Sequence, residues 1–210
     1  MTETTKQLIV LASGNAGKLR EFNAILAPLE WNIKPQSDFD VTEVPETGLS
    51  FVENALIKAR NASRHTGHAA LADDSGIEVD ALKGAPGIYS ARYAGDACND
   101  QDNNEKLLRD LANIPAAQRT ARYRACLVYM RHADDPVPII AEGHWEGLIV
   151  DQARGDNGFG YDPYFWLPEF SCTAAELEPE QKNKISHRAT ALSALLTRVL
   201  ENQSHAQKPD

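Results

Sequence analysis

An apolar run at residues 8–12 leads directly into a glycine-containing turn and then a helical pattern, and this order constrains the fold more than any other feature. The run is continuous rather than alternating, which is typical of a strand covered on both faces. The turn occupies residues 13–17, and apolar residues then recur at helical spacing from Leu19 to Leu29. A chain that opens with strand, turn and helix is expected to build a layered α/β structure.

Strand and helix patterns intermix along the rest of the chain. Ser50 and Glu53 have capping-box spacing ahead of an apolar helical stripe. Residues 69–72 predict a strand that ends at Asp73, and a further strand is expected at residues 77–79. The other predicted elements are a long loop over residues 83–96, a helix over 101–111, an antiparallel strand pair over 120–131 and 139–150, a final helix through 189–199, and a disordered tail over 201–210.

Composition narrows the classes of function that fit the chain. Its 210 residues include 30 acidic and 21 basic side chains, and the formal charge of −9 disfavours non-specific binding to nucleic acid. No apolar run approaches the roughly 20 residues that a membrane helix needs, so no membrane span is expected. The three cysteines form no C-x-x-C pair, which argues against a disulfide framework or a zinc site and favours a reducing, cytoplasmic location.

The turn at residues 13–18 has the composition of an anion site. Backbone N–H groups at a helix N-terminus attract anions, and Lys18 adds a positive charge beside them. The segment is not a Walker A loop, because only two residues separate Gly14 from Gly17 and Leu19 stands where that motif has serine or threonine. A plain glycine turn with a solvated lysine is the alternative interpretation.

Two neighbouring aspartates, Asp73 and Asp74, follow an apolar run, where α/β sheets usually present functional side chains. Adjacent strand residues point to opposite faces, so we expect one carboxylate to face a given cleft. With Glu46 or Glu43 from a proline-containing loop, that carboxylate would suit Mg²⁺, which takes one or two carboxylates and completes its shell with water and phosphate. The alternative is that an aspartate caps the turn at Ser75.

A glycine-rich segment at residues 155–163 contains two aromatic residues, Phe159 and Tyr161. Glycine lets a backbone approach a ligand closely, and an aromatic ring offers a face on which a base can stack; the alternative is that both rings seal the core. A basic cluster follows near the start of the last helix, where positive charge is unfavourable because of the helix dipole. A ligand's phosphate or carbonyl oxygen bound among these side chains would explain the cluster; the alternative is a solvated charged face. Its members are Lys182, Lys184, His187 and Arg188.

Several short motifs, each weak alone, occur in one order along nearly the whole chain. They are residues 13–18, residues 45–48 with 53–55 and Lys58, residues 72–76 with 87–92, residues 158–163 and residues 182–188. Together they resemble the inosine triphosphate pyrophosphatase family, also called non-canonical purine nucleoside triphosphate pyrophosphatases. The departures are small: Ser13 replaces a common threonine and Gln181 a common acid.

The resemblance implies a fold and an activity. The expected fold is a single α/β domain over residues 1–200, with two lobes around a long mixed sheet and a central substrate groove. The expected activity is Mg²⁺-dependent hydrolysis of ITP, dITP or XTP between the α and β phosphates, which yields the monophosphate and pyrophosphate and keeps deaminated purines out of DNA and RNA. The resemblance also implies a homodimer.

Roles for individual residues follow from the same resemblance. Asp74 is the expected proton acceptor with Asp73 as a supporting acid, and Glu46 and Asp74 are the expected magnesium ligands; Glu43 stays an alternative to Glu46. The expected substrate-binding residues are Ser13, Gly14, Asn15, Ala16, Gly17, Lys18, Lys58, Ser75, Phe159, Gly160, Tyr161, Asp162, Lys182, His187 and Arg188.

Other functions stay open on the sequence alone. A related pyrophosphatase would act on pyrimidine or modified nucleotides, a non-catalytic nucleotide sensor would use the carboxylates only to cap turns, and a phosphatase would release orthophosphate. Selection of ITP over ATP is expected to rest on the 6-keto oxygen, an acceptor where adenine presents a donor amine.

Overall fold

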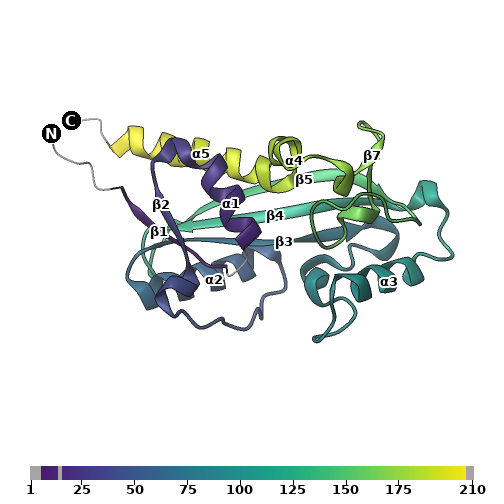
Figure 1. Cartoon of the computed structure of the whole chain (residues 1–210). Coiled ribbons are helices and arrows are strands. Elements are labelled where there is room, and N and C mark those ends of the chain that lie inside the picture. Colours follow the sequence, from purple (N-terminus) through teal and green to yellow (C-terminus); the bar gives the residue numbers. More distant parts are fainter. Residues whose placement is uncertain (1–5, 14–15, 207–210) are drawn as a thin grey trace. The chain divides into compact units, whose positions relative to one another are not determined.

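The computed structural model describes residues 6–13 and 16–206. Its helices are α1 (Ala16–Ile25), α2 (Phe51–Thr66), α3 (Asp100–Asp110), α4 (Pro179–Ile185) and α5 (His187–Ala206). Its strands are β1 (Leu8–Leu11), β2 (Asn32–Pro35), β3 (Ala69–Val79), β4 (Thr120–Met130), β5 (Ile139–Ile149), β6 (Phe165–Leu167) and β7 (Cys172–Thr173). The described strands form one 7-stranded sheet in the order β2-β1-β3-β4-β5-β6-β7 (Figure 1).

Pairing within the sheet is mixed. β1 pairs in parallel with β2 and with β3, so that Ile9 lies opposite Ile33 on one side and Ala69 on the other. β6 pairs antiparallel with β5 and with β7, and Leu148 lies opposite Trp166. The predicted α/β class with a mixed sheet is therefore confirmed.

β3 is one continuous strand, and the prediction that it ends at Asp73 is wrong. Asp73 and Asp74 are both buried inside it. Buried carboxylates need partners, and each finds a lysine: Lys18 at Asp73 and Lys58 at Asp74. The apolar pattern stops at these residues because they are charged, whereas the backbone continues as strand.

The chain divides into two units. Unit 1 contains Met1–Asp74, Cys126–Gly143 and Thr190–Asp210, and unit 2 contains Ser75–Ala125 and His144–Ala189. In unit 1, Ala55 and Ala59 of α2 belong to one buried cluster with Val10 of β1, Ala70 of β3 and Val128 of β4. The predicted apolar stripe of α2 is thus its buried face.

Aromatic side chains build the core of unit 2. Leu107 of α3 lies in one buried cluster with Tyr123, Trp145, Tyr161 and Phe165. The rings of Tyr123 and Phe165 are 4.6 Å apart and tilted by 58°, a favourable arrangement for two aromatic side chains. Because Tyr161 belongs to this cluster, the glycine-rich segment is attached directly to the core.

Helix boundaries follow local signals. The side chain of Ser50 accepts a hydrogen bond from the Glu53 backbone N–H at the start of α2, which confirms the predicted cap. α1 ends at Ile25, earlier than predicted, and a 3-10 helix follows at Ala27–Leu29, where Pro28 lacks a backbone donor. Among the described residues no helix is both long and apolar enough to span a membrane.

The C-terminal part of the chain differs from the sequence prediction in its tail. The basic cluster lies where it was predicted, because Lys182 precedes the last helix, in α4, and His187 begins α5. α5 continues to Ala206, so residues 201–206 are helical rather than part of a disordered tail. Residues 207–210 lie outside the described residues. The predicted loop over residues 83–96 contains a 3-10 helix at Gly87–Arg92.

Candidate active site

The first ion pair of the candidate site joins α1 to β3 in unit 1. Nζ of Lys18, in the first turn of α1, lies 2.8 Å from Oδ2 of Asp73, whose side chain is fully buried. Of the predicted phosphate-binding turn, Ser13 precedes α1, and Ala16 opens the helix. Gly14 and Asn15 lie outside the described residues.

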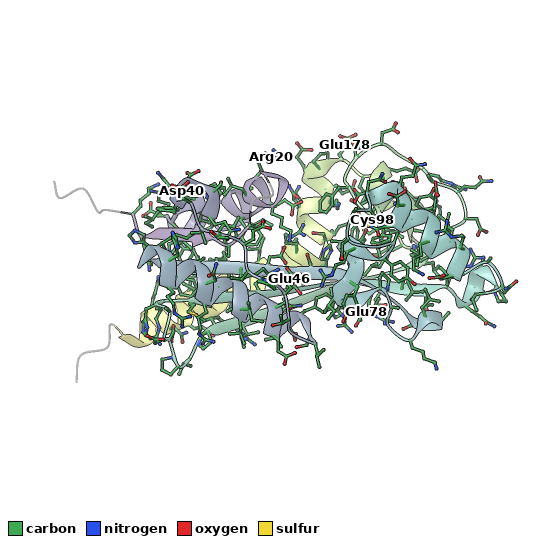
Figure 2. The ribbon with its side chains drawn as sticks, turned by 90° about the horizontal axis from the view of Figure 1, so that it is seen from below. Arg20, Asp40, Glu46, Glu78, Cys98 and Glu178 are labelled. Carbon is green, nitrogen blue, oxygen red and sulfur yellow. The ribbon has the colours of Figure 1, made fainter. Side chains whose placement is uncertain are left out.

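The second cluster lies between α2, β3 and the loop that precedes α2. Nζ of Lys58 is 2.6 Å from Oδ1 of Asp74 and 2.9 Å from Oε1 of Glu46. Figure 2 labels Glu46 among the side chains. The ammonium group thus bridges the two carboxylates that the sequence predicted as metal ligands. Glu43, the alternative ligand, is exposed to solvent.

The two aspartates use lysines from different helices. Lys18 of α1 pairs with Asp73, and Lys58 of α2 pairs with Asp74. Two helices thus supply one cation each to consecutive positions of β3. That only one of the two carboxylates faces a given cleft stays a prediction.

The loop that carries Glu46 is fastened to the first turns of α2. The Gly48 backbone N–H donates to Oδ1 of Asn54 over 2.8 Å, and the Leu49 backbone N–H donates to Oε2 of Glu53 over 2.9 Å. Asn54 is fully buried. Sequence reasoning gave Asn54 no role, although it lies in one of the matching segments, because a helical asparagine has no pattern that distinguishes a loop tether from a solvated amide.

Burial and neighbouring charges shift the pKa values in this cluster. Burial raises the pKa of Asp74, and the nearby carboxylates of Glu46 and Asp73 add to that effect against the opposing influence of Lys58. Burial lowers the pKa of Lys58, but Asp74 and Glu46 outweigh it, so that the pKa is raised and the ammonium stays charged. The cluster therefore holds a permanent positive charge beside a carboxylate that takes a proton more readily than ordinary aspartate.

The donor set fits a hard divalent cation. Oδ2 of Asp74 is buried and receives no hydrogen bond from the described residues. Within the described part of the chain no group of three or more His, Cys, Asp or Glu is arranged to hold a metal ion. Two carboxylates, Glu46 and Asp74, would therefore be the protein's contribution, which matches the way Mg²⁺ binds with water and substrate phosphates in its remaining positions.

In unit 2, Asp162 is the centre of a buried hydrogen-bond network. Its carboxylate accepts from Nζ of Lys182 at 2.5 Å, from the Tyr123 hydroxyl at 3.1 Å and from the Phe159 backbone N–H at 2.9 Å. Burial and the adjacent Asp162 charge raise the pKa of Tyr123 well above its ordinary value, so its hydroxyl stays a donor. Tyr123 was missed from the sequence, where an aromatic residue in a strand pattern indicates only core.

Residues 158–162, here called the Phe159 loop, present one aromatic ring to solvent. Phe159 is 46% exposed, with Nζ of Lys182 5.2 Å and Cζ of Arg188 6.0 Å from its ring centroid. Tyr161 is buried, and its hydroxyl donates to the Ser90 carbonyl over 2.7 Å. Of the two aromatic residues, Phe159 is thus the one that can stack on a base, and Tyr161 seals the core.

Two further predicted residues lie in the same unit. The ring of His187 stacks on Tyr123 at 4.7 Å and 12°. Arg188 donates to the Ser75 hydroxyl over 3.3 Å. The structure thus gathers the predicted residues into two sets: Lys18, Glu46, Lys58, Asp73 and Asp74 in unit 1, and Ser75, Phe159, Gly160, Tyr161, Asp162, Lys182, His187 and Arg188 in unit 2.

Comparison with known proteins identifies the family. The model of the Ham1 family matches residues 9–198. A relative from Thioalkalivibrio sulfidiphilus, described as a dITP/XTP pyrophosphatase, is 61% identical over 191 residues, which cover 91% of this chain and 97% of that protein. A relative of the same description from Vibrio vulnificus is 58% identical over 193 residues, 92% of this chain and 96% of that protein.

Solved structures agree with the sequence comparison. The structure of a HAM1 protein from Coxiella burnetii has a TM-score of 0.88 and 47% identity, and the match covers 93% of this chain and 99% of that one. The family inferred from the short motifs is thereby confirmed. The chain belongs to the Ham1 family.

Proposed function

We propose that this protein hydrolyses non-canonical purine nucleoside triphosphates, namely dITP, ITP and XTP, to the monophosphate and pyrophosphate. The observation that carries the proposal is the cluster of Lys58 with Glu46 and Asp74, in a chain whose relatives are described as dITP/XTP pyrophosphatases. A lysine held between two carboxylates can bind the phosphate groups of an anhydride substrate. If the carboxylates only capped turns, they would not need this lysine.

The lysines of unit 1 neutralise the substrate. A triphosphate carries several negative charges, and the protein's formal charge of −9 repels it, so the positive charge must be local. Lys18 and Lys58 supply two ammonium groups at consecutive positions of β3. Charge that builds up on the leaving pyrophosphate is stabilised by these groups in the transition state.

Asp74 is the proton acceptor in the proposed reaction. It takes a proton from a water molecule whose oxygen bonds to the α phosphorus, while the bond from that phosphorus to the α–β bridging oxygen breaks. The electron pair of the broken bond stays with the bridging oxygen, and pyrophosphate leaves.

Magnesium is the proposed cofactor, with Glu46 and Asp74 as its protein ligands. When bound, the ion would supply positive charge at the phosphate oxygens. The two carboxylates and the free Oδ2 lone pairs of Asp74 support this assignment.

Unit 2 supplies base recognition in this proposal. The exposed ring of Phe159 offers a stacking face, and Lys182 and Arg188 lie beside it as donors. A 6-keto oxygen accepts hydrogen bonds from such donors, whereas the amine of adenine would leave them unpaired, and mismatches of that kind discriminate by up to about 10⁴-fold.

Product analysis tests the proposal against its rivals. With dITP and Mg²⁺ we expect pyrophosphate, whereas a phosphatase would release orthophosphate and a sensor would release neither. Asp74→Asn should lose at least about 100-fold in kcat while keeping its thermal unfolding midpoint near that of the wild type. Turnover of this variant near the wild-type rate would refute the assignment, and equal rates with dATP or pyrimidine nucleotides would refute the substrate class.

A matched pair of substitutions in one loop tests the metal ligand. Glu46→Gln should raise the Mg²⁺ concentration needed for half-maximal activity, and exposed Glu43→Gln should not. The reverse result would assign the ligand to Glu43.

The cellular setting completes the proposal: a cytoplasmic homodimer. Cys98, Cys126 and Cys172 are all free thiols, which fits a reducing compartment. The homodimer rests on the family resemblance, and light scattering coupled to gel filtration measures it directly.

A further inference from the structure

Two side chains of helix α3 bind the backbone N–H and the backbone carbonyl of Gly160, in the Phe159 loop. The Gly160 backbone N–H donates to Oδ2 of Asp100 over 2.7 Å, and the Gly160 carbonyl accepts from Nδ2 of Asn104 over 2.8 Å. Asp100 is the first residue of α3 and Asn104 stands one turn later, so both side chains come from the same helix end. All three residues belong to unit 2.

This attachment is anchored in the helix itself. Nδ2 of Asn104 also donates to the Asp100 carbonyl over 2.8 Å, and Asn104 is only 6% exposed. The Asn99 and Asp102 side chains form a capping box at the same helix end. The helix end is therefore ordered independently of the loop, and it provides a fixed support.

The opposite side of the loop is fixed as well. The Phe159 backbone N–H donates to Asp162, and Gly158 and Gly160 have φ values of +82° and +64°, which favour glycine. The backbone is thus held immediately before and after Phe159, yet its ring stays 46% exposed. A large apolar side chain that is exposed to this extent and held at its backbone suits a surface on which a flat ligand stacks.

We propose that Asp100 and Asn104 are positioning residues that hold the ring of Phe159 ready to stack on the purine base. This inference rests on the proposed function and adds two residues that lie outside every motif matched from the sequence. Holding a loop in its bound conformation before the ligand arrives removes the entropic cost of ordering it during binding. The clamp therefore acts on affinity for the base and leaves the phosphate-binding lysines of unit 1 unaffected.

Two product ligands separate these effects. Inosine monophosphate carries the base, whereas pyrophosphate does not. Loss of one clamping hydrogen bond should weaken the binding of inosine monophosphate about fivefold to tenfold and leave the binding of pyrophosphate unchanged. In steady-state assays with dITP the same variants should show a raised KM with kcat unchanged.

The experiment is calorimetric titration of the full chain, in the presence of Mg²⁺, with each of the two ligands. Asn104→Leu removes the donor and keeps the branched shape and the number of side-chain heavy atoms. Asp100→Ala removes an exposed acceptor with little risk to folding. Asp100→Asn is the conservative rescue, because its amide oxygen can still accept the Gly160 N–H. Asn103→Leu is the matched control, because Asn103 is equally buried in α3 but bonds to the backbone of Ala91 and Ala94.

We expect Asn104→Leu and Asp100→Ala to bind inosine monophosphate more weakly and pyrophosphate as the wild type does. Asp100→Asn and Asn103→Leu should bind both ligands with wild-type affinity. Unchanged affinity in Asp100→Ala, or equal weakening of both ligands, would overturn the inference; if Asn104→Leu does not fold, Asp100→Ala decides. Failure of the proposed function is seen separately, as absence of pyrophosphate release from dITP by the wild type, because the titrations need no turnover.

Discussion

The buried ion pair of Lys182 and Asp162 leads to a quantitative prediction for Lys182→Met. Only 11% of the Lys182 side chain and 3% of the Asp162 side chain are exposed, and the ion pair spans 2.5 Å. Methionine keeps most of the apolar stem of lysine and removes the charge, so the variant leaves a buried carboxylate without its cation. The substitution therefore measures an electrostatic effect more than a packing effect.

The loss of unfolding free energy depends on the hydrogen bonds that the Asp162 carboxylate keeps in Lys182→Met. Breaking one side of a buried ion pair costs about 3–5 kcal/mol of unfolding free energy, because the remaining charge is desolvated. The carboxylate still accepts from the Tyr123 hydroxyl and the Phe159 backbone N–H, so we expect the lower end, about 3 kcal/mol. Adding Asp162→Asn removes the stranded charge and should restore at least about 1 kcal/mol of that loss.

Urea unfolding followed by circular dichroism measures these values. Lys184→Met is the control, because Lys184 is exposed and lies two residues further along α4, and its cost should stay within about 0.5 kcal/mol. A cost below about 1 kcal/mol for Lys182→Met would contradict the argument. So would a double variant less stable than Lys182→Met, since neutralising the stranded carboxylate would then bring no benefit.

Two further predictions concern backbone strain and pH. Gly158→Ala should lower the unfolding free energy by more than about 1 kcal/mol, because the residue has φ of +82° and an added Cβ would lie 2.1 Å from Oδ2 of Asp162. Gly160→Ala, with φ of +64° and open space around the added Cβ, should lower it less. Equal unfolding midpoints for the two variants would contradict this. Hydrogen bonds from Arg122 lower the pKa of Asp80 to about 2, below its unfolded value of about 3.9, so its stabilisation is present above pH 4 and is lost as the pH falls through 2. Asp80→Asn should therefore lower stability by up to about 1 kcal/mol near neutral pH and by nothing below pH 2, as acid titration of thermal unfolding can check.

Local sequence patterns predicted most elements of the fold. The run at residues 8–12, the cap at Ser50 and the alanine stripe of α2 depend on neighbours in the chain, and the structure contains all three. The sequence prediction ended β3 too early, because two consecutive aspartates indicate a strand end when the lysines that pair with them are not known. Those partners come from distant segments, which a local pattern does not contain.

The sequence predicted the charged residues of the candidate site but not the residues that hold them or the Phe159 loop in place. Lys58 and Asp74 were found through motif resemblance, and the structure pairs them. Tyr123 and Asn104 were not found, because one is a strand aromatic and the other a polar helix residue, both common in any α/β protein. What gives them a role is contact with the Phe159 loop or Asp162, and such contacts exist only in the folded chain.

The division of unit 1 into three stretches of chain bears on how the protein is made. Its last stretch, from Thr190 onward, contributes Ala191, Leu192, Leu195 and Val199, all buried. Nascent chains generally fold domain by domain as they leave the ribosome. Here the first 74 residues cannot complete their core until the final helix has been translated. Premature termination near the boundary at Ala189 would therefore remove from unit 1 the last helix of its core, and we expect cellular proteases to degrade such a product as an incompletely folded chain.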